Sequence, residues 1–257
     1  MIFDNHMHSE MSSDSKMKIE EILKVQKENN LGVTITEHVD WNYRNPNLFR
    51  CDVKAYLKAY EKYRNDTLNL GIEIGLGEEI LDKNIETSNN NFDLVLGSIH
   101  IVNDKDIFNE FFQEGVTKQA GFEEYFEFTA KCIELYDCFQ VLSHLDYPSR
   151  YAPFKDPEMY YEDFSDHIDT VLRTLIRKDK VLELNTRRLN DKTAFNNLNT
   201  ILKRYYDLGG RYISLGSDAH KPQDIMNNFE AGLTMLNSLN LTPVTFREKK
   251  LIPLNIK

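Results

Sequence analysis

Histidines in this sequence gather at a few positions, each at the end of a short apolar run. Six of the seven lie there: His6, His8, His38, His100, His144 and His220. Three carboxylates accompany them: Asp14, Glu73 and Asp218. Imidazole and carboxylate groups without thiolates are ligands that suit zinc, iron or manganese. The pattern therefore predicts a metal centre.

Nine candidate ligands are too many for a single tetrahedral ion. His6 and His8 are two residues apart, so in an extended strand both project from the same side and can reach one ion. Asp218 and His220 repeat this spacing. We therefore expect two or three divalent ions, either zinc, iron or manganese. A lone histidine is usually structural, so the prediction rests on the set, and His167, within a helical pattern, is excluded.

Short apolar runs alternate with segments of helical periodicity along almost the whole chain. The runs predict seven strands, Ile2–His8, Gly32–Glu37, Asn69–Leu76, Asp93–His100, Phe139–His144, Val181–Asn185 and Tyr212–Ser217. Helical patterns cover residues 19–25, 53–63, 122–135, 168–176, 194–206 and 222–238. This alternation predicts an α/β fold with parallel strands joined by crossover helices.

A parallel barrel would bring the predicted ligands together, because all its strands end at one face. The polar segments 42–49 and 88–91 are expected to be solvated connections, and the first is long enough to act as a lid or substrate loop. The tail after Leu239 is expected to add a peripheral strand. No repeat or linker divides the sequence, so residues 1–257 are expected to form a single domain.

Charge, cysteine content and the lack of long apolar runs limit the partners and the location expected for this chain. Asp and Glu number 41 against 31 Lys and Arg, and this net charge of −10 disfavours extended nucleic acid and anionic membranes. The three cysteines leave one unpaired in any disulfide scheme and show no CxxC spacing, which favours a reducing cytoplasm. No run of about 18 apolar residues is present to span a bilayer, and no secretory leader is expected.

Several motifs resemble the polymerase and histidinol phosphatase (PHP) superfamily. They are DNHMHS, TEH, GSIH, SHLDYPSRY, ELNTR and GSDAH, with Asp14 and the Gly-Ile-Glu of the third strand. Within the superfamily, HLDYPSRY and ELNTR look most like the monofunctional bacterial histidinol-phosphate phosphatases. The resemblance runs from Phe3 to His220. It implies a distorted seven-stranded (β/α)7 TIM-like barrel, which agrees with the strand count read from the pattern.

The resemblance also implies how the ligands divide among three ions. The first ion would take His6, His8, Glu73 and Asp218; the second Glu73, His100 and His144; the third Asp14, His38 and His220. Glu78 and Glu79 compete for the role of Glu73, since they also follow the third strand. LNLGIE matches the family pattern better, which favours Glu73.

The implied activity is hydrolysis of L-histidinol phosphate to L-histidinol and phosphate in histidine biosynthesis, with metal-bound hydroxide as the nucleophile. Two ions can lower the pKa of a shared water and clamp phosphoryl oxygens. Arg150 and Arg187 follow two strands at the same face and are expected to bind phosphate oxygens bidentately. Asp218, His220 or a metal-bound water is expected to pass a proton to the leaving oxygen.

The substrate's ammonium and imidazole need carboxylate or aromatic partners, and Asp40, Trp41 and Tyr43 follow the second strand. One alternative is another PHP phosphoesterase acting on phosphotyrosine, nucleotides or sugar phosphates, because the metal centre does not distinguish leaving groups. The other is a noncatalytic metal-stabilised binding module. The presence of all nine ligands and both arginines argues against it.

Overall fold

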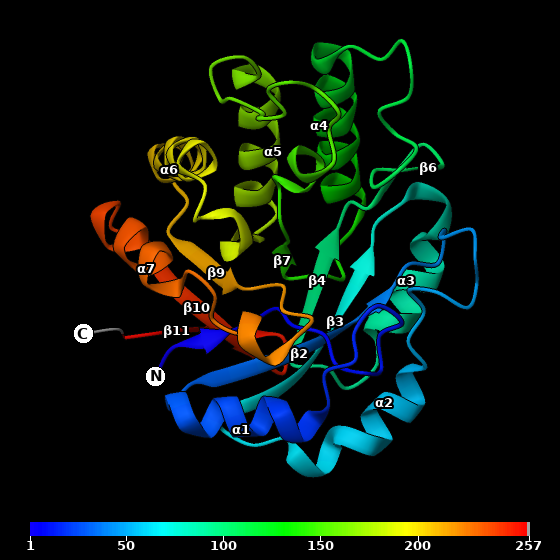
Figure 1. Cartoon of the computed structure of the whole chain (residues 1–257), viewed down its shortest axis with the longest axis vertical. Coiled ribbons are helices and arrows are strands. Elements are labelled where there is room, and N and C mark those ends of the chain that lie inside the picture. Colours follow the sequence, from blue (N-terminus) through cyan, green and yellow to red (C-terminus); the bar gives the residue numbers. More distant parts are fainter. Residues whose placement is uncertain (256–257) are drawn as a thin grey trace.

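The computed structural model describes residues 1–255 and shows a parallel sheet at the centre with helices around its outside (Figure 1). The strands are β1 (Phe3–Asp4), β2 (Gly32–Val39), β3 (Leu68–Gly75), β4 (Leu94–Ser98), β5 (Ile101–Val102), β6 (Lys105–Asp106), β7 (Val141–Leu142), β8 (Val181–Asn185), β9 (Tyr212–Gly216), β10 (Thr242–Arg247) and β11 (Lys250–Pro253). The helices are α1 (Ile19–Asn29), α2 (Val53–Tyr60), α3 (Leu81–Ser88), α4 (Lys118–Leu135), α5 (Ser165–Arg177), α6 (Lys192–Asp207) and α7 (Phe229–Ser238).

The main sheet has the order β1-β2-β3-β4-β7-β8-β9-β10-β11, and only the last pair is antiparallel. The segment after β1 connects its first edge to β9. Asn5 N donates to Leu215 O at 2.9 Å, and Asp218 N donates to His6 O at 2.8 Å. Seven of the parallel strands, β1 to β4 and β7 to β9, thus surround one interior, as expected for a distorted barrel. β5 and β6 form a separate hairpin.

Side chains on the strands alternate between two cores. On β3, Leu70 and Ile72 belong to the main core, which also holds Tyr56 of α2. Glu73 has the opposite orientation, and the strand register pairs it with His38 of β2. Alternation therefore fills the space beneath the helices with apolar groups and directs polar groups into the barrel.

The C-terminal strands close the base of the barrel. Val244 and Phe246 of β10 are buried in a second core with Leu94, Leu96, Val141 and Val181. Asn69 Nδ2 donates to Phe246 O at 2.9 Å. The expected peripheral strand is confirmed as β11, which lies at the sheet edge. The tail also adds β10, which reaches the interior.

Two expected elements differ in detail, and one helix was not expected. The helix expected over 222–238 is two elements, a 3₁₀ turn at Pro222–Asp224 and α7. Met226 and Asn228 separate them, because both have positive φ angles, 61° and 59°, that no α-helix accommodates. Helix α3 was not predicted, and the expected connection over 88–91 begins inside it, with Ser88 buried. The connection over 42–49 is confirmed.

The described residues contain neither a disulfide nor a helix suited to span a membrane. Cys51, Cys132 and Cys138 are free thiols. Within residues 1–255, no helix combines the length and the hydrophobicity needed to cross a bilayer.

The packing of β10 predicts a large stability effect. Phe246→Ala should lower the free energy of unfolding by about 3–5 kcal/mol, because it leaves a cavity in the barrel interior. Ile252→Ala on β11, where the side chain is 41% exposed, is the control and should change it by less than about 0.5 kcal/mol. Urea denaturation measures both values. An equally small decrease in the free energy of unfolding for both variants would place β10 outside the core.

Candidate metal centre

Four of the predicted ligands converge beneath the floor of a cavity at the C-terminal end of the barrel. Glu73 Oε2 lies 3.3 Å from His6 Nε2 and 3.5 Å from His8 Nε2. Asp218 Oδ1 lies 3.5 Å from His8 Nε2 and 3.8 Å from His6 Nε2. Separations near 3.4 Å are those of ligand atoms sharing one ion with bonds of about 2.0–2.1 Å. The two histidines follow β1, Glu73 lies in β3 and Asp218 follows β9.

The second oxygen of Glu73 faces a different pair of histidines. Its Oε1 lies 3.4 Å from His100 Nε2 and 3.0 Å from His144 Nε2. Ser98 Oγ donates to the same oxygen at 2.6 Å and so fixes the carboxylate plane. A single carboxylate therefore stands between two groups of imidazoles, as a bridging ligand would.

A third group surrounds Asp14, which lies in the loop after β1. Its Oδ2 is 2.9 Å from His220 Nε2 and 3.4 Å from His38 Nε2. His38 Nδ1 also lies 2.9 Å from Glu73 Oε2, so the third group adjoins the first. All nine predicted ligands are thus brought together. Their division among three ions stays a prediction, because His8, His38 and His220 also form a possible group of three.

Unpartnered atoms in the cluster fit a bound cation. His6 Nε2, His8 Nε2 and Glu73 Oε2 are buried and make no hydrogen bond with any of the described residues. A buried polar group without a partner costs about 1–3 kcal/mol. Three such atoms facing one another provide lone pairs in the arrangement that a divalent cation takes. The donor set and its geometry therefore fit metal ions.

The electrostatics of the cluster give Glu73 and His8 their metal-binding protonation states. Burial alone would raise the pKa of Glu73, but His6, His38 and His100 outweigh it and hold that pKa well below its usual range. Burial, together with His38 and His220, lowers the pKa of His8 to about 3. At neutral pH the carboxylate is therefore ionised and the His8 imidazole is neutral, which are the forms that bind metals. For His6, His38 and His100, by contrast, burial is outweighed by neighbouring carboxylates, which raise the pKa of each imidazole.

Glu183 of β8 supports the cluster and was missed in the sequence. Its Oε1 lies 2.7 Å from His6 Nδ1, and its Oε2 accepts a hydrogen bond from His144 N at 2.7 Å. Such a partner fixes the ring orientation and tautomer of a ligating histidine. A side chain at Gly216 would be excluded, because a Cβ there would lie 2.3 Å from Glu183 Oε1. The sequence signal that could have identified Glu183 is a carboxylate at an inward-facing position of a buried strand.

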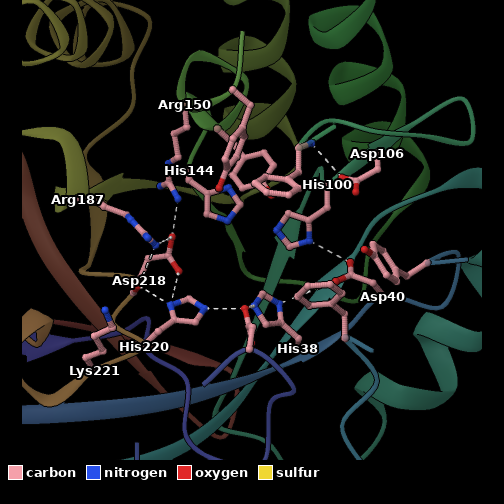
Figure 2. Close-up of a pocket in the computed structure, with 16 residues that line it drawn as sticks. His38, Asp40, His100, Asp106, His144, Arg150, Arg187, Asp218, His220 and Lys221 are labelled. Atoms are coloured by element: carbon pink, nitrogen blue, oxygen red, sulfur yellow. Dashed lines mark hydrogen bonds and ion pairs between the residues drawn. The ribbon is translucent and has the colours of Figure 1, made fainter. Parts of the chain in front are cut away.

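A cavity of about 410 Å³ opens above the cluster (Figure 2). Its lining includes Asp14, His38, Asp40, Tyr43, Phe49, His100, Asp106, Phe108, His144, Tyr147, Arg150, Tyr151, Arg187, Asp218, His220 and Lys221. Pockets for small molecules typically have this size. Five predicted ligands, His38, His100, His144, Asp218 and His220, are among the side chains labelled in Figure 2.

The two predicted phosphate-binding arginines both line this cavity. Arg150 Nη1 donates to Asp218 Oδ2 at 2.6 Å, and Arg187 Nη1 lies 3.4 Å from the same oxygen. Arg150 is almost fully buried, and its Nε and Nη2 make no hydrogen bond with the described residues. Burial lowers the pKa of Arg150, but Asp218 and Asp146 outweigh it and keep the guanidinium charged. A buried cation whose hydrogen-bond donors have no partner is typical of an anion-binding site.

The loop after β2 contributes less than expected. Tyr43 lines the cavity. Asp40 borders it, but its side chain is buried and its Oδ1 lies 3.0 Å from His100 Nδ1, so it orients a predicted ligand. Trp41 does not line the cavity; its Nε1 donates to Thr87 Oγ1 of α3 at 3.0 Å. The structure thus brings Tyr43 and Asp40, but not Trp41, to the site.

The hairpin of β5 and β6 supplies the opposite wall, which the sequence did not indicate. Asp106 and Phe108 line the cavity from it, and Tyr151 packs on Phe108 with ring centroids 4.9 Å apart. In Figure 2 the carboxylates Asp40 and Asp106 lie across the cavity from Arg150 and Arg187. The cavity is therefore positive on one side and negative on the other.

Comparisons with known proteins give a consistent result. The model of the PHP domain family matches residues 4–187. A protein of Clostridium acetobutylicum named "Probable histidinol-phosphatase" is 44% identical over 98% of this chain and 99% of its own length. A protein of the same name from Thermotoga maritima is 32% identical over the full length of both chains. The histidinol phosphate phosphatase of Lactococcus lactis, solved with zinc, L-histidinol and phosphate, superposes with a TM-score of 0.90 at 24% identity, covering 98% of both chains.

The position of Glu73 predicts its effect on metal content. Glu73→Gln removes the negative charge of a carboxylate that stands between two groups of histidines, so each chain should retain at least one ion fewer after reconstitution. Inductively coupled plasma mass spectrometry gives the count. Glu79→Gln is the matched control, because Glu79 is exposed and, among the described residues, accepts a hydrogen bond only from Asn42, at 3.1 Å. Unchanged stoichiometry in Glu73→Gln would remove this residue from the metal centre.

Proposed function

Because this chain belongs to the PHP domain family, we propose that it is a metal-dependent phosphomonoesterase that hydrolyses L-histidinol phosphate to L-histidinol and inorganic phosphate. The observation that carries the proposal is the buried, unpartnered guanidinium edge of Arg150 beside the cluster of nine ligands. The curated relatives named above support the same substrate. In this proposal residues 1–257 form one PHP domain that acts in histidine biosynthesis in the cytoplasm.

The residues of the cluster would hold two or three divalent ions, either zinc, iron or manganese. When bound, such ions lower the pKa of water and neutralise phosphoryl charge, which is the main barrier to attack on a phosphate dianion. His6, His8, Glu73 and Asp218 are the ligands best supported by distance. The relative from Lactococcus lactis was solved with zinc, which supports zinc among these three metals.

The arginines bind the phosphate. Arg150 offers two free donors from a buried position, and Arg187, whose side chain is 49% exposed, reaches in from the cavity mouth. Asp218 Oδ2 accepts from both and so holds them toward the same point. Their planar donors neutralise charge on the phosphoryl oxygens as the ester bond breaks.

Neither predicted proton donor is free for that role. Burial raises the pKa of Asp218, but Arg150 and His8 outweigh it and hold this pKa well below its usual range, so the carboxylate only accepts. His220 has both ring nitrogens engaged, with Nδ1 2.9 Å from Asp218 O and Nε2 2.9 Å from Asp14 Oδ2. We therefore assign the proton of the leaving oxygen to solvent and keep both residues as ligands.

The polarity of the cavity matches a substrate with charges of both signs. Histidinol phosphate carries a phosphate dianion at one end and an ammonium with an imidazole at the other. The arginine wall suits the phosphate, and Asp106 with Tyr43 and Phe108 suits the cationic and aromatic end. This complementarity favours histidinol phosphate over phosphotyrosine, nucleotides and sugar phosphates, whose leaving groups carry no net positive charge at neutral pH.

A panel of phosphate esters tests the proposed function. The protein reconstituted with zinc, manganese or ferrous iron is assayed for phosphate release from histidinol phosphate, phosphotyrosine and a nucleoside monophosphate. We expect kcat/KM for histidinol phosphate to exceed the others by about 10–100-fold, the equivalent of one charged hydrogen bond. Equal rates on all three would favour a broad phosphoesterase. No turnover with any metal would favour the noncatalytic binding module.

Asp106→Asn tests the recognition of the leaving group. The change removes the charge but keeps an acceptor for Phe108 N, which donates to Asp106 Oδ1 at 3.0 Å. KM for histidinol phosphate should rise about tenfold, and KM for phenyl phosphate should stay constant. Asp104→Asn on the same hairpin is the control, because Asp104 is exposed and outside the cavity lining. An equal effect of Asp106→Asn on both esters would contradict this assignment.

A further inference from the structure

Arg188 lies next to Arg187 in the chain but binds away from the cavity. Its Nη1 lies 3.0 Å from Asp146 Oδ2, and its Nη2 lies 2.6 Å from Glu158 Oε2. Both carboxylates are buried, with only 2% of each residue exposed. We call these three residues the Arg188 clamp. A single planar guanidinium thus neutralises two buried charges at once.

The clamp joins the two turns that carry the phosphate-binding arginines. Arg188 ends the 3₁₀ turn Thr186–Arg188, which contains Arg187. Asp146 immediately precedes the 3₁₀ turn Tyr147–Arg150, which ends with the other arginine. The turns follow β8 and β7, so the clamp fixes one strand end relative to its neighbour.

Glu158 anchors the clamp to the helical layer. Asn197 of α6 donates to Glu158 Oε1 at 3.0 Å and to Met159 O at 2.8 Å. Tyr161 N in turn donates to Asn197 Oδ1 at 3.0 Å. The segment that holds Glu158 lies between the turn at residue 150 and α5, and has no helix of its own. The clamp therefore ties both turns to α6.

We propose that Arg188 is a positioning residue for phosphate binding, an inference that rests on the proposed function. Arg150 and Arg187 converge on Asp218 Oδ2, at 2.6 and 3.4 Å, only while their turns keep this relative placement. Without Arg188, its turn loses the link to Asp146, and the buried carboxylates of Asp146 and Glu158 repel each other. The two turns are then no longer held in this placement. The arginine donors then no longer meet at one phosphate.

Arg188→Lys tests the inference, because lysine keeps the charge but cannot bind two carboxylates in one plane. The readouts are the Kd of inorganic phosphate for the zinc-loaded protein, measured by calorimetry, and kcat and KM for histidinol phosphate. Phosphate Kd and KM should both rise about tenfold, since small displacements of positioning groups cost up to about 100-fold. Bound zinc should be unchanged.

The matched control is Arg204→Lys, because Arg204 of α6 also binds a carboxylate with two nitrogens. Its Nε lies 2.8 Å and its Nη2 2.5 Å from the oxygens of Asp169 in α5, outside the cavity lining. This variant should lower the melting temperature without changing phosphate Kd. If Arg188→Lys behaves in the same way, the clamp is structural only and the inference is overturned.

Two further measurements separate the inference from its premise. Glu158→Gln keeps the shape of the side chain and weakens one arm of the clamp, so it should also raise phosphate Kd, and it replaces Arg188→Lys if that variant does not fold. An unchanged Kd in Glu158→Gln would overturn the inference. Wild-type protein that neither binds phosphate nor hydrolyses histidinol phosphate would instead overturn the proposed function, and the inference with it.

Discussion

One buried carboxylate organises the functional end of this barrel. The two oxygens of Glu73 lie within 3.5 Å of nitrogen atoms of five histidines, His6, His8, His38, His100 and His144. An isolated buried carboxylate with so many imidazoles around it would be costly, because several of their nitrogens have no partner among the described residues. Bound cations would supply these missing partners. The five histidines lie at the ends of β1, β2, β4 and β7, so the barrel has to bring four strand ends into register around one side chain of β3.

The rest of the molecule provides that register. The closing bonds between the segment after β1 and β9 place His6 against Asp218, and β10 fills the base so that the interior is solid below the cluster. Above the cluster, the arginines and the hairpin of β5 and β6 form walls of opposite charge. Stability is thus concentrated at the base, and recognition is concentrated in loops at the opposite end, as in other parallel barrels.

Much of this arrangement could be predicted from the sequence, because it rests on local patterns. Buried parallel strands are short apolar runs, and each polar residue at the end of such a run stands out. The seven strands of the barrel, and the nine residues that gather in one cluster, could therefore be identified. What could not be predicted depends on contacts between distant segments. In the sequence, Glu183 is simply a carboxylate within a strand, and its role depends on its contact with His6. Asp106 lies on a hairpin whose orientation toward the cavity cannot be predicted from sequence periodicity. Trp41 failed as a cavity residue because proximity along the chain to His38 does not fix the direction of a side chain.

Anomalous diffraction from crystals of the zinc-loaded protein tests the central role of Glu73 most directly. Peaks at the zinc edge should lie at the cluster, with one Glu73 oxygen bound beside His6 and His8 and the other beside His100 and His144. Zinc bound elsewhere, or ions at the cluster with Glu73 turned away from them, would contradict the account.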